Sequence, residues 1–260
     1  MKIAISGKGG VGKTLLSSSL AKIFSDSDYK VIAIDADPDA NLAATLGFPD
    51  PEAIVPISEM KELIQERTGA IPGQSAPYFK LNPKVDDIPD KYAQVHNNIR
   101  LMIMGRIKKG GAGCYCPENA LLQTLMGHLL LARNEVIILD MEAGIEHLGR
   151  GTAGAVDELI IVVEPGRRSI ETAANIKELA SQIGLNNIAV VGNKVRNDAD
   201  RDFIISNLNG IKVLGFIPYD ESVIEADHAG SHPLESSDSV RSAVTEIYDR
   251  LVSDVENQQR

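Results

Sequence analysis

A glycine- and lysine-rich segment near the N-terminus, GKGGVGKT, has the composition and spacing of a phosphate-binding loop. Gly7, Gly12, Lys13 and Thr14 fit the pattern G-x-x-x-x-G-K-[ST], with an apolar run before it and a helical pattern after it. In such a loop backbone N–H groups and the lysine hold phosphate oxygens, and the hydroxyl ligates Mg²⁺. The segment therefore predicts a site for ATP or ADP, formed by Gly7, Lys8, Gly9, Gly10, Val11, Gly12, Lys13, Thr14 and Leu15.

Carboxylates follow two further apolar runs. One run ends in Asp35-Ala-Asp37-Pro-Asp39, and another ends in Asp140. Carboxylates this close together are costly unless positive charge balances them, and Mg²⁺ with the loop lysines would provide that balance. We expect Thr14, Asp37 and Asp140 to hold the magnesium ion, and Asp39 is a weaker candidate for a place near Asp37. The competing interpretation is an acidic surface turn and a simple strand-end cap.

The chain has two cysteines, Cys114 and Cys116, in a glycine-rich segment before a predicted helix. In an extended segment residues i and i+2 point to the same side, so both thiols would face one way. Two thiolates cannot complete a tetrahedral site, but two chains around a two-fold axis supply four, which suits Zn²⁺ or a related transition metal. A Cys-x-Cys pair is a weak motif, and two ordinary cysteines remain the alternative.

Composition narrows the classes of partner. The 260 residues carry a formal charge of −10, and 43% are hydrophobic. Such acidity argues against binding to a nucleic-acid backbone, which depends on Lys and Arg. The N-terminus does not resemble a signal peptide, and no stretch approaches the roughly 20 apolar residues of a membrane span. We expect a cytoplasmic protein with neither nucleic acid nor membrane as a partner.

Apolar runs alternate with helical patterns along the chain, which predicts one doubly wound α/β domain over residues 1–260, with a mostly parallel sheet flanked by helices. The expected strands are Lys2–Ser6, Val31–Asp35, Ile99–Met104, Val136–Asp140, Glu158–Val163, Ile188–Asn193 and Val213–Ile217. The expected helices are Lys13–Phe24, Pro117–Leu131, Ser169–Ile183, Arg201–Leu208 and Val240–Val252. Residues 49–98 are rich in proline and are expected to form a long insertion with one helix, Ser58–Glu66.

The early lysine of KGGVGKT resembles the deviant P-loop group, which contains the MinD and ParA ATPases, the nitrogenase iron protein and the arsenite-pump ATPase. The resemblance implies that Lys8 reaches the nucleotide of a second subunit, and that Asp37 orients the attacking water. It makes Lys8, Lys13 and Asp37 the catalytic candidates.

The same resemblance implies that the base lies against the residues that follow two late strands, Asn193-Lys194 and Pro218-Tyr219. It also implies adenine as the base. Arg196 stands where an aspartate would read guanine, so the chain lacks the guanine-reading motif.

Longer motifs resemble one family more specifically, the CooC/AcsF maturation ATPases of carbon monoxide dehydrogenase and acetyl-CoA synthase. They are DADPDANL at Asp35–Leu42, GCYCPE at Gly113–Glu118, DMEAGIEHLGRGTAGA at Asp140–Ala155 and VVEPGRRS at Val162–Ser169. This resemblance implies an ATP-dependent homodimer that assists nickel insertion into one of those enzymes, with Ni²⁺ or Zn²⁺ between the two Cys-x-Cys pairs.

Three other classes stay open at this point. They are a partition or positioning ATPase, an iron–sulfur carrier like the nitrogenase iron protein, and an ATPase that handles no metal.

Overall fold

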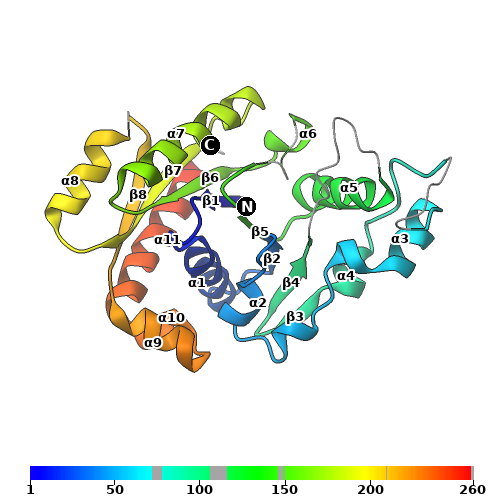
Figure 1. Ribbon diagram of the computed structural model, residues 1–260, viewed down its shortest axis with the longest axis horizontal. Coiled ribbons are helices and arrows are strands. Elements are labelled where there is room, and N and C mark those ends of the chain that lie inside the picture. Colours follow the sequence, from blue (N-terminus) through cyan, green and yellow to red (C-terminus); the bar gives the residue numbers. More distant parts are fainter. Residues whose placement is uncertain (72–77, 106–115, 146–147, 149, 209, 259–260) are drawn as a thin grey trace.

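The computed structural model describes residues 1–71, 78–105, 116–145, 148, 150–208 and 210–258. In this part of the chain, eight strands form one sheet in the order β3-β4-β2-β5-β1-β6-β7-β8 (Figure 1). The strands are β1 (Lys2–Gly7), β2 (Val31–Ala36), β3 (Gln94–His96), β4 (Ile99–Ile103), β5 (Val136–Met141), β6 (Glu158–Val163), β7 (Ile188–Val195) and β8 (Lys212–Pro218). All seven strands predicted from the apolar runs are present.

Parallel pairing follows from the composition of the strands. The central strands are nearly continuous runs of buried Ile, Val, Leu and Ala, because helices cover both of their faces. One described pair, β3 with β4, is antiparallel. A two-residue turn joins these strands, and its residues Asn97 and Asn98 have φ of 47° and 61°, which asparagine tolerates better than most residues. Strand β3 was not predicted, because three residues are too few to show the alternation of apolar and polar side chains that indicates a strand.

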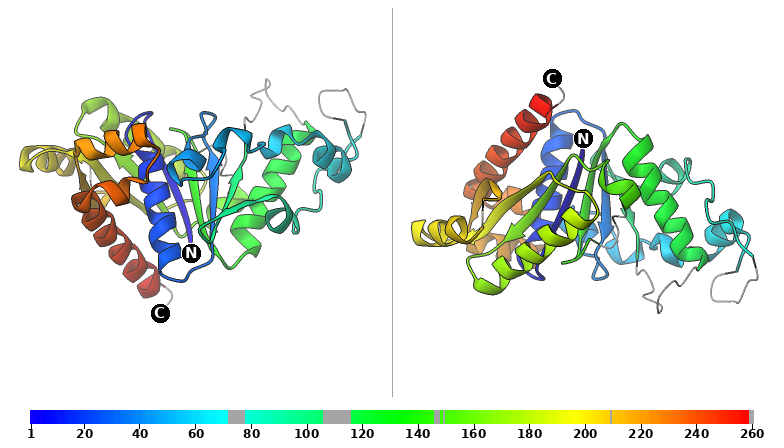
Figure 2. Two further views of the ribbon diagram at one scale, coloured as in Figure 1. Left: turned by 90° about the horizontal axis from the view of Figure 1, so that it is seen from below. Right: turned by 90° about the horizontal axis from the view of Figure 1, so that it is seen from above.

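Two layers of helices enclose the sheet (Figure 2). On one face α1 and α11 lie side by side, and α2, α9 and α10 border them. On the other face α5, α7 and α8 pack over the strands, with the short α6 against α5. The helices are α1 (Lys13–Asp26), α2 (Leu42–Thr45), α5 (Pro117–Ala132), α6 (Arg150–Ala153), α7 (Arg167–Gln182), α8 (Asp198–Asn207), α9 (Glu221–Ala229), α10 (Pro233–Ser236) and α11 (Asp238–Gln258).

The proline-rich insertion is more structured than expected and lies at one end of the molecule, against α5 (Figure 1). It contains two 3₁₀ turns, η1 (Pro51–Ala53) and η2 (Ile57–Glu59), followed by α3 (Lys61–Thr68), α4 (Ile88–Tyr92) and β3. The expected helix Ser58–Glu66 is confirmed only from Lys61 on, because its first residues belong to η2. Met60 has φ −75° and ψ 77°, so the backbone leaves the helical region there and divides the segment into η2 and α3.

Helices α9 and α10 were also missing from the prediction. Asp220 is the N-cap of α9, and its carboxylate accepts the Ser222 N–H; His232 is the N-cap of α10, and its ring nitrogen accepts the Leu234 N–H. Both are local capping contacts of side chains with the backbone. Such short helices carry too little periodic pattern to stand out in the sequence.

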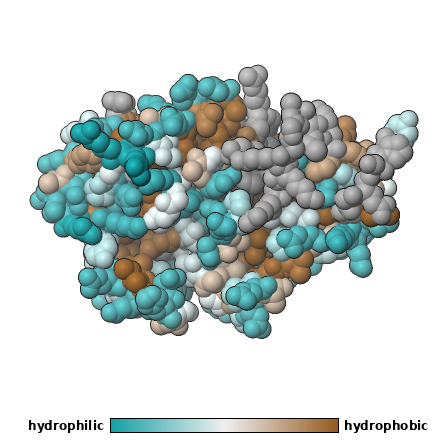
Figure 3. Space-filling model, viewed as in Figure 1, coloured by the Kyte–Doolittle hydropathy of each residue, from teal (hydrophilic) through white to brown (hydrophobic). Residues whose placement is uncertain are grey.

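The described surface is largely polar on the side drawn in Figure 3, with smaller and separate hydrophobic patches. Among the described residues, no helix is both long and apolar enough to cross a bilayer. The cytoplasmic location expected from the sequence stays a prediction.

Glu158, the first residue of β6, gives the fold a titratable group away from the phosphate loop. Its side chain is only 3% exposed, and burial raises the pKa of its carboxyl to about 7. The folded state therefore holds the Glu158 proton more tightly than the unfolded state, whose pKa is near 4.5. The raised pKa of Glu158 therefore stabilises the folded protein at low pH. This stabilisation is lost as the pH rises from about 4.5 to about 7.

We expect Glu158→Gln to be more stable relative to the wild type at pH 8 than at pH 5, by about 2 kcal/mol, because glutamine does not ionise. Urea unfolding at the two pH values measures this difference. Equal stability differences at both pH values would contradict the buried, proton-bearing Glu158.

Candidate nucleotide-binding site

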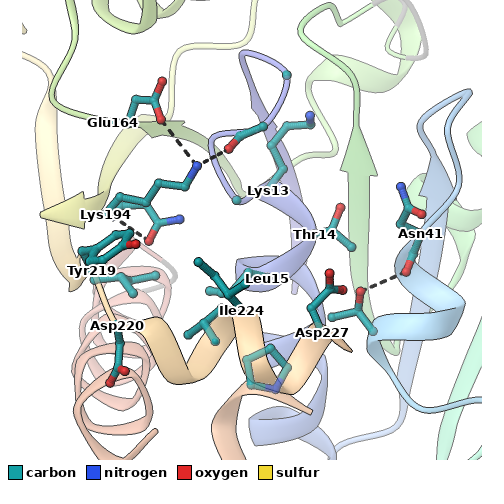
Figure 4. A pocket seen from close by; sticks show the side chains of 18 of the residues that line it. Lys13, Thr14, Leu15, Asn41, Glu164, Lys194, Tyr219, Asp220, Ile224 and Asp227 are labelled. Carbon is teal, nitrogen blue, oxygen red and sulfur yellow. Dashed lines mark hydrogen bonds and ion pairs between the residues drawn. The ribbon is translucent and has the colours of Figure 1, made fainter. Parts of the chain in front are cut away.

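A cleft of about 1250 Å³ opens at the carboxyl ends of the parallel strands (Figure 4). Its lining comes from the phosphate loop, from the segments that follow β2, β5, β6, β7 and β8, and from α9. In open α/β sheets ligands bind at this edge. Most of the residues that the sequence singled out line the cleft: Gly9, Gly10, Gly12, Lys13, Thr14, Leu15, Asp37, Asn193, Lys194, Pro218 and Tyr219.

The glycines of the loop are required by close contacts as well as by backbone conformation. A Cβ on Gly7 would lie 2.5 Å from the Val162 carbonyl oxygen of β6. Gly12 has φ +97°, and a Cβ there would lie 2.1 Å from the amide nitrogen of Asn193. Both positions therefore exclude any side chain, and they fix how the loop turns from β1 into α1. Gly7 and Val11 are buried and belong to the loop without lining the cleft.

Lys13 lies at the start of α1, where helix N–H groups and the helix dipole favour an anion. No side chain caps this helix, and its first turn has no acidic residue. The ammonium of Lys13 is 3.4 Å from a carboxylate oxygen of Asp37, and the Lys13 side chain is only 7% exposed. The predicted phosphate-binding lysine and the predicted hydrolytic aspartate therefore meet at the floor of the cleft.

The residues present fit a Mg²⁺ ion at Thr14 and Asp140. The Thr14 hydroxyl donates to Oδ2 of Asp140 at 2.8 Å. The other oxygen, Oδ1, is buried and has no hydrogen-bond partner among the residues that the structure describes. Burial first, and then the nearby Asp35 carboxyl, raise the pKa of Asp140 to about 7. A divalent cation would satisfy this oxygen and favour the ionised carboxylate.

Asp35 was not predicted as a site residue, although its position at the end of a buried strand signalled it. It is fully buried and adjoins Asp140 in the pairing of β2 with β5. Its carboxylate accepts the N–H of Asp37 at 3.2 Å and that of Leu42 at 3.0 Å. Burial raises its pKa to about 6. Asp35 thus holds both ends of residues 37–41, which we call the Asp37 loop.

Asn193 and Lys194 support the phosphate loop. The amide of Asn193, which is 3% exposed, donates to the Val11 carbonyl at 2.7 Å and accepts the Lys194 N–H at 2.8 Å. The ammonium of Lys194 donates to the Gly10 carbonyl at 2.6 Å and lies 3.6 Å from Glu164, between the two in Figure 4. These contacts favour a structural role for Asn193, because one of its amide hydrogens and its oxygen are already bonded within the protein.

The other end of the cleft is suited to a flat, partly apolar group. The guanidinium of Arg196 lies 4.7 Å from the centre of the Tyr219 ring, a cation–π contact that orders both side chains. Leu15 and the exposed Ile224 of α9 project into the space beside them (Figure 4). Glu164, Arg196 and Ile224 also line the cleft but were not predicted as site residues. Their place there depends on the order of the strands in the sheet, which the sequence alone does not reveal.

Neither Lys8 nor Cys116 is among the described residues that line this cleft. Lys8 is half-buried. Cys116 occupies the N-cap position of α5 and is half-buried, whereas Cys114 lies outside the described residues. Within the described ranges, no group of three or more His, Cys, Asp and Glu side chains could hold a metal ion.

We expect Asn193→Ala to destabilise the protein by about 1–3 kcal/mol, because the buried Val11 carbonyl would lose its donor. Urea unfolding measures the loss. Asn207→Ala is a matched control, since the Asn207 amide makes a comparable bond to the Phe203 carbonyl but is exposed. We expect a change within about 0.5 kcal/mol for the control. Equal losses in both variants would argue against the supporting role of Asn193.

Comparisons with known proteins agree with this geometry. The family model described as "CobQ/CobB/MinD/ParA nucleotide binding domain" matches residues 2–234. An uncharacterised ATP-binding protein of Methanocaldococcus jannaschii is 47% identical over 97% of this chain and 98% of its own. The carbon monoxide dehydrogenase accessory protein CooC of Rhodospirillum rubrum is 49% identical over 88% of each chain.

Solved structures confirm the predicted α/β fold. A ParA family ATPase from Chlorobium tepidum superposes with a TM-score of 0.70 at 18% identity, covering 96% of this chain and 98% of its own. The MinD cell division protein of Aquifex aeolicus gives a TM-score of 0.68 at 22% identity, covering 97% and 96%. The chain therefore belongs to the CobQ/CobB/MinD/ParA nucleotide-binding family, within the group that includes CooC.

Proposed function

We propose that this chain is a Mg²⁺-dependent ATPase that dimerises with ATP and assists nickel insertion into carbon monoxide dehydrogenase or acetyl-CoA synthase. The observation that carries the proposal is the 49% identity to CooC over 88% of both chains. The cleft supports it independently, because the phosphate loop, a threonine bonded to the buried Asp140 and a partly apolar pocket adjoin one another there.

ATP binding would begin at the phosphate loop. The start of α1 and Lys13 would hold the β- and γ-phosphates, and Thr14 with Asp140 would hold the Mg²⁺ ion. The adenine would lie toward Pro218 and Tyr219. Mg²⁺ would neutralise charge on the β- and γ-phosphates as the γ-phosphoryl group passes to water and ADP leaves.

Asp37 is the residue we assign to the attacking water. Its carboxylate is 3.4 Å from Lys13, the residue proposed to hold the phosphates, and this distance supports the assignment. Asp35 bonds to the Asp37 N–H and so fixes the backbone that carries this carboxylate. Asp37 also belongs to the proposed magnesium site, in which a water-mediated contact would suffice.

Lys8 would complete the site of the opposite subunit. It is half-buried and lies outside the cleft of its own chain, which suits a role across an interface. A cation delivered in this way stabilises the charge that develops during hydrolysis, so hydrolysis would wait for a second subunit.

The metal ion is proposed as the cargo of the dimer. Cys114 and Cys116 from each chain would supply four thiolates to Ni²⁺ or Zn²⁺ when the subunits meet. ATP would favour the closed dimer and metal binding, and hydrolysis would open it and release the metal. Nucleotide and metal would then bias the same two-state equilibrium.

We expect Lys8→Ala to bind an ATP analogue with about wild-type affinity but to lose most ATP hydrolysis and ATP-dependent dimerisation, because the lysine acts on the partner's nucleotide. Titration calorimetry, phosphate release and equilibrium sedimentation measure these three properties. Lys30→Ala, an exposed lysine at the opposite end of the strands, is the control and should behave as the wild type. Unchanged hydrolysis in Lys8→Ala would refute the trans role.

We expect the wild type, prepared anaerobically with a non-hydrolysable ATP analogue, to bind one Ni²⁺ or Zn²⁺ per dimer. Cys114→Ala and Cys116→Ala should each remove that metal while keeping nucleotide binding, because four thiolates are needed. Elemental analysis per dimer gives the stoichiometry. Metal content that these substitutions do not change would rule out the interfacial site, and a brown protein that binds iron and sulfide would indicate an iron–sulfur carrier instead.

A further inference from the structure

Ser6, in β1, is a polar residue with a fully buried side chain, and it directly precedes Gly7 of the phosphate loop. Its hydroxyl donates to the Glu142 carbonyl at 2.8 Å and lies 3.3 Å from the Gly144 carbonyl. A hydroxyl has one hydrogen, so the two carbonyls share it and the shorter contact is the main bond. Ser6 therefore ties the start of the phosphate loop to residues 142–144.

Residues 142–144 are the segment in which the chain leaves the sheet after β5. They follow Asp140 and Met141 and belong to neither a helix nor a strand. The register aligns Ile5 of β1 with Asp140 of β5, so Ser6 lies beside the last residue of β5. A side chain at this position can reach the backbone that comes next, and that of Ser6 does.

The order of the strands puts this segment on the proposed phosphate side of the cleft. Strand β5 lies between β2, which leads to Asp37, and β1, which leads to the phosphate loop and Lys13. Tyr219, on the proposed side of the base, follows β8 at the edge of the sheet. Glu142 and Ala143 line the cleft, so they do so on the side where Lys13 and Asp37 meet.

The bond from Ser6 fixes the direction in which one peptide group of this segment faces. None of the described peptide bonds is cis, so the Glu142 carbonyl and the Ala143 N–H point in opposite directions. The carbonyl faces the buried Ser6, and the Ala143 N–H therefore faces away from it. Ala143 is exposed and lines the cleft. This orientation suits a donor to an oxygen atom bound in the cleft.

We propose that Ser6 is a positioning residue for ATP hydrolysis, which holds the Ala143 N–H toward the γ-phosphate through the Glu142 carbonyl. This inference rests on the proposed function, in which Lys13 holds the phosphates and Asp37 orients the attacking water. A donor fixed before the nucleotide binds stabilises the charge on the phosphoryl oxygens as the group passes to water. ADP lacks the γ-phosphate, so its binding does not depend on this donor.

The experiment compares Ser6→Ala with Ser6→Thr, which keeps the hydroxyl, and with Ser25→Ala. Ser25 is also buried, and its hydroxyl donates to the Asn97 carbonyl at 3.0 Å, near the end of α1 that is remote from the phosphate loop. This control loses a comparable bond away from the cleft. For each protein, phosphate release gives kcat and KM, calorimetry gives the ADP affinity, and sedimentation measures dimerisation with a non-hydrolysable ATP analogue.

In Ser6→Ala we expect kcat to fall by about 10- to 100-fold, because a slightly misplaced group can cost this much in rate. KM, ADP affinity and dimerisation should stay as in the wild type. Ser25→Ala should match the wild type in all four properties, and Ser6→Thr should recover most of the lost kcat. Should Ser6→Thr not fold, Ser6→Ala compared with Ser25→Ala carries the test.

A wild-type kcat in Ser6→Ala overturns the inference and leaves the proposed function intact, as does a folded Ser6→Thr that is equally slow. A loss of ADP affinity or of dimerisation as large as the loss of kcat also overturns it, since Ser6 would then act on the phosphate loop or on the interface. A wild type that does not hydrolyse ATP overturns both the inference and the proposed function.

Discussion

Two buried carboxylates at adjacent strand ends set the constraint on which the site depends. Asp35 and Asp140 are held next to each other by the register of β2 with β5, and both are almost fully buried. Burial raises the pKa of both carboxyls, and the Asp35 carboxyl raises that of Asp140 further, so the edge of the sheet favours a proton or a cation between the strands. Two side chains of α1 partly compensate the carboxylates at this edge: Lys13 forms an ion pair with Asp37, and the Thr14 hydroxyl donates a hydrogen bond to Asp140.

The same pair connects binding to the rest of the fold. Asp140 is bonded to the first turn of α1, and Asp35 is bonded to both ends of the Asp37 loop and, through its carbonyl, to β4. A cation bound at this edge would therefore act at once on the phosphate loop, on the Asp37 loop and on the residue that follows β4. A small charge change at one point can bias several elements because packed interfaces move as units.

Much of the fold was predictable because parallel strands are covered on both faces and read as long apolar runs. The phosphate loop was predictable because its function fixes residue types at fixed spacing, and Thr14 and Asp140 are indeed hydrogen-bonded. Short elements escaped, since β3 has only three residues and α10 only four. The helix expected at Ser58–Glu66 is divided into η2 and α3 because Met60 leaves the helical region, a change of backbone direction that apolar periodicity does not reveal.

Lys194 and Asn193 hold the phosphate loop in shape from outside, through the carbonyls of Gly10 and Val11. A glycine-rich segment would otherwise sample many backbone conformations, and a ligand that ordered it would lose affinity in proportion to the entropy removed. Here side chains of β7 have already removed much of that freedom. An arriving nucleotide can therefore retain more of its contact energy as affinity, which is how preorganised sites bind tightly with few contacts.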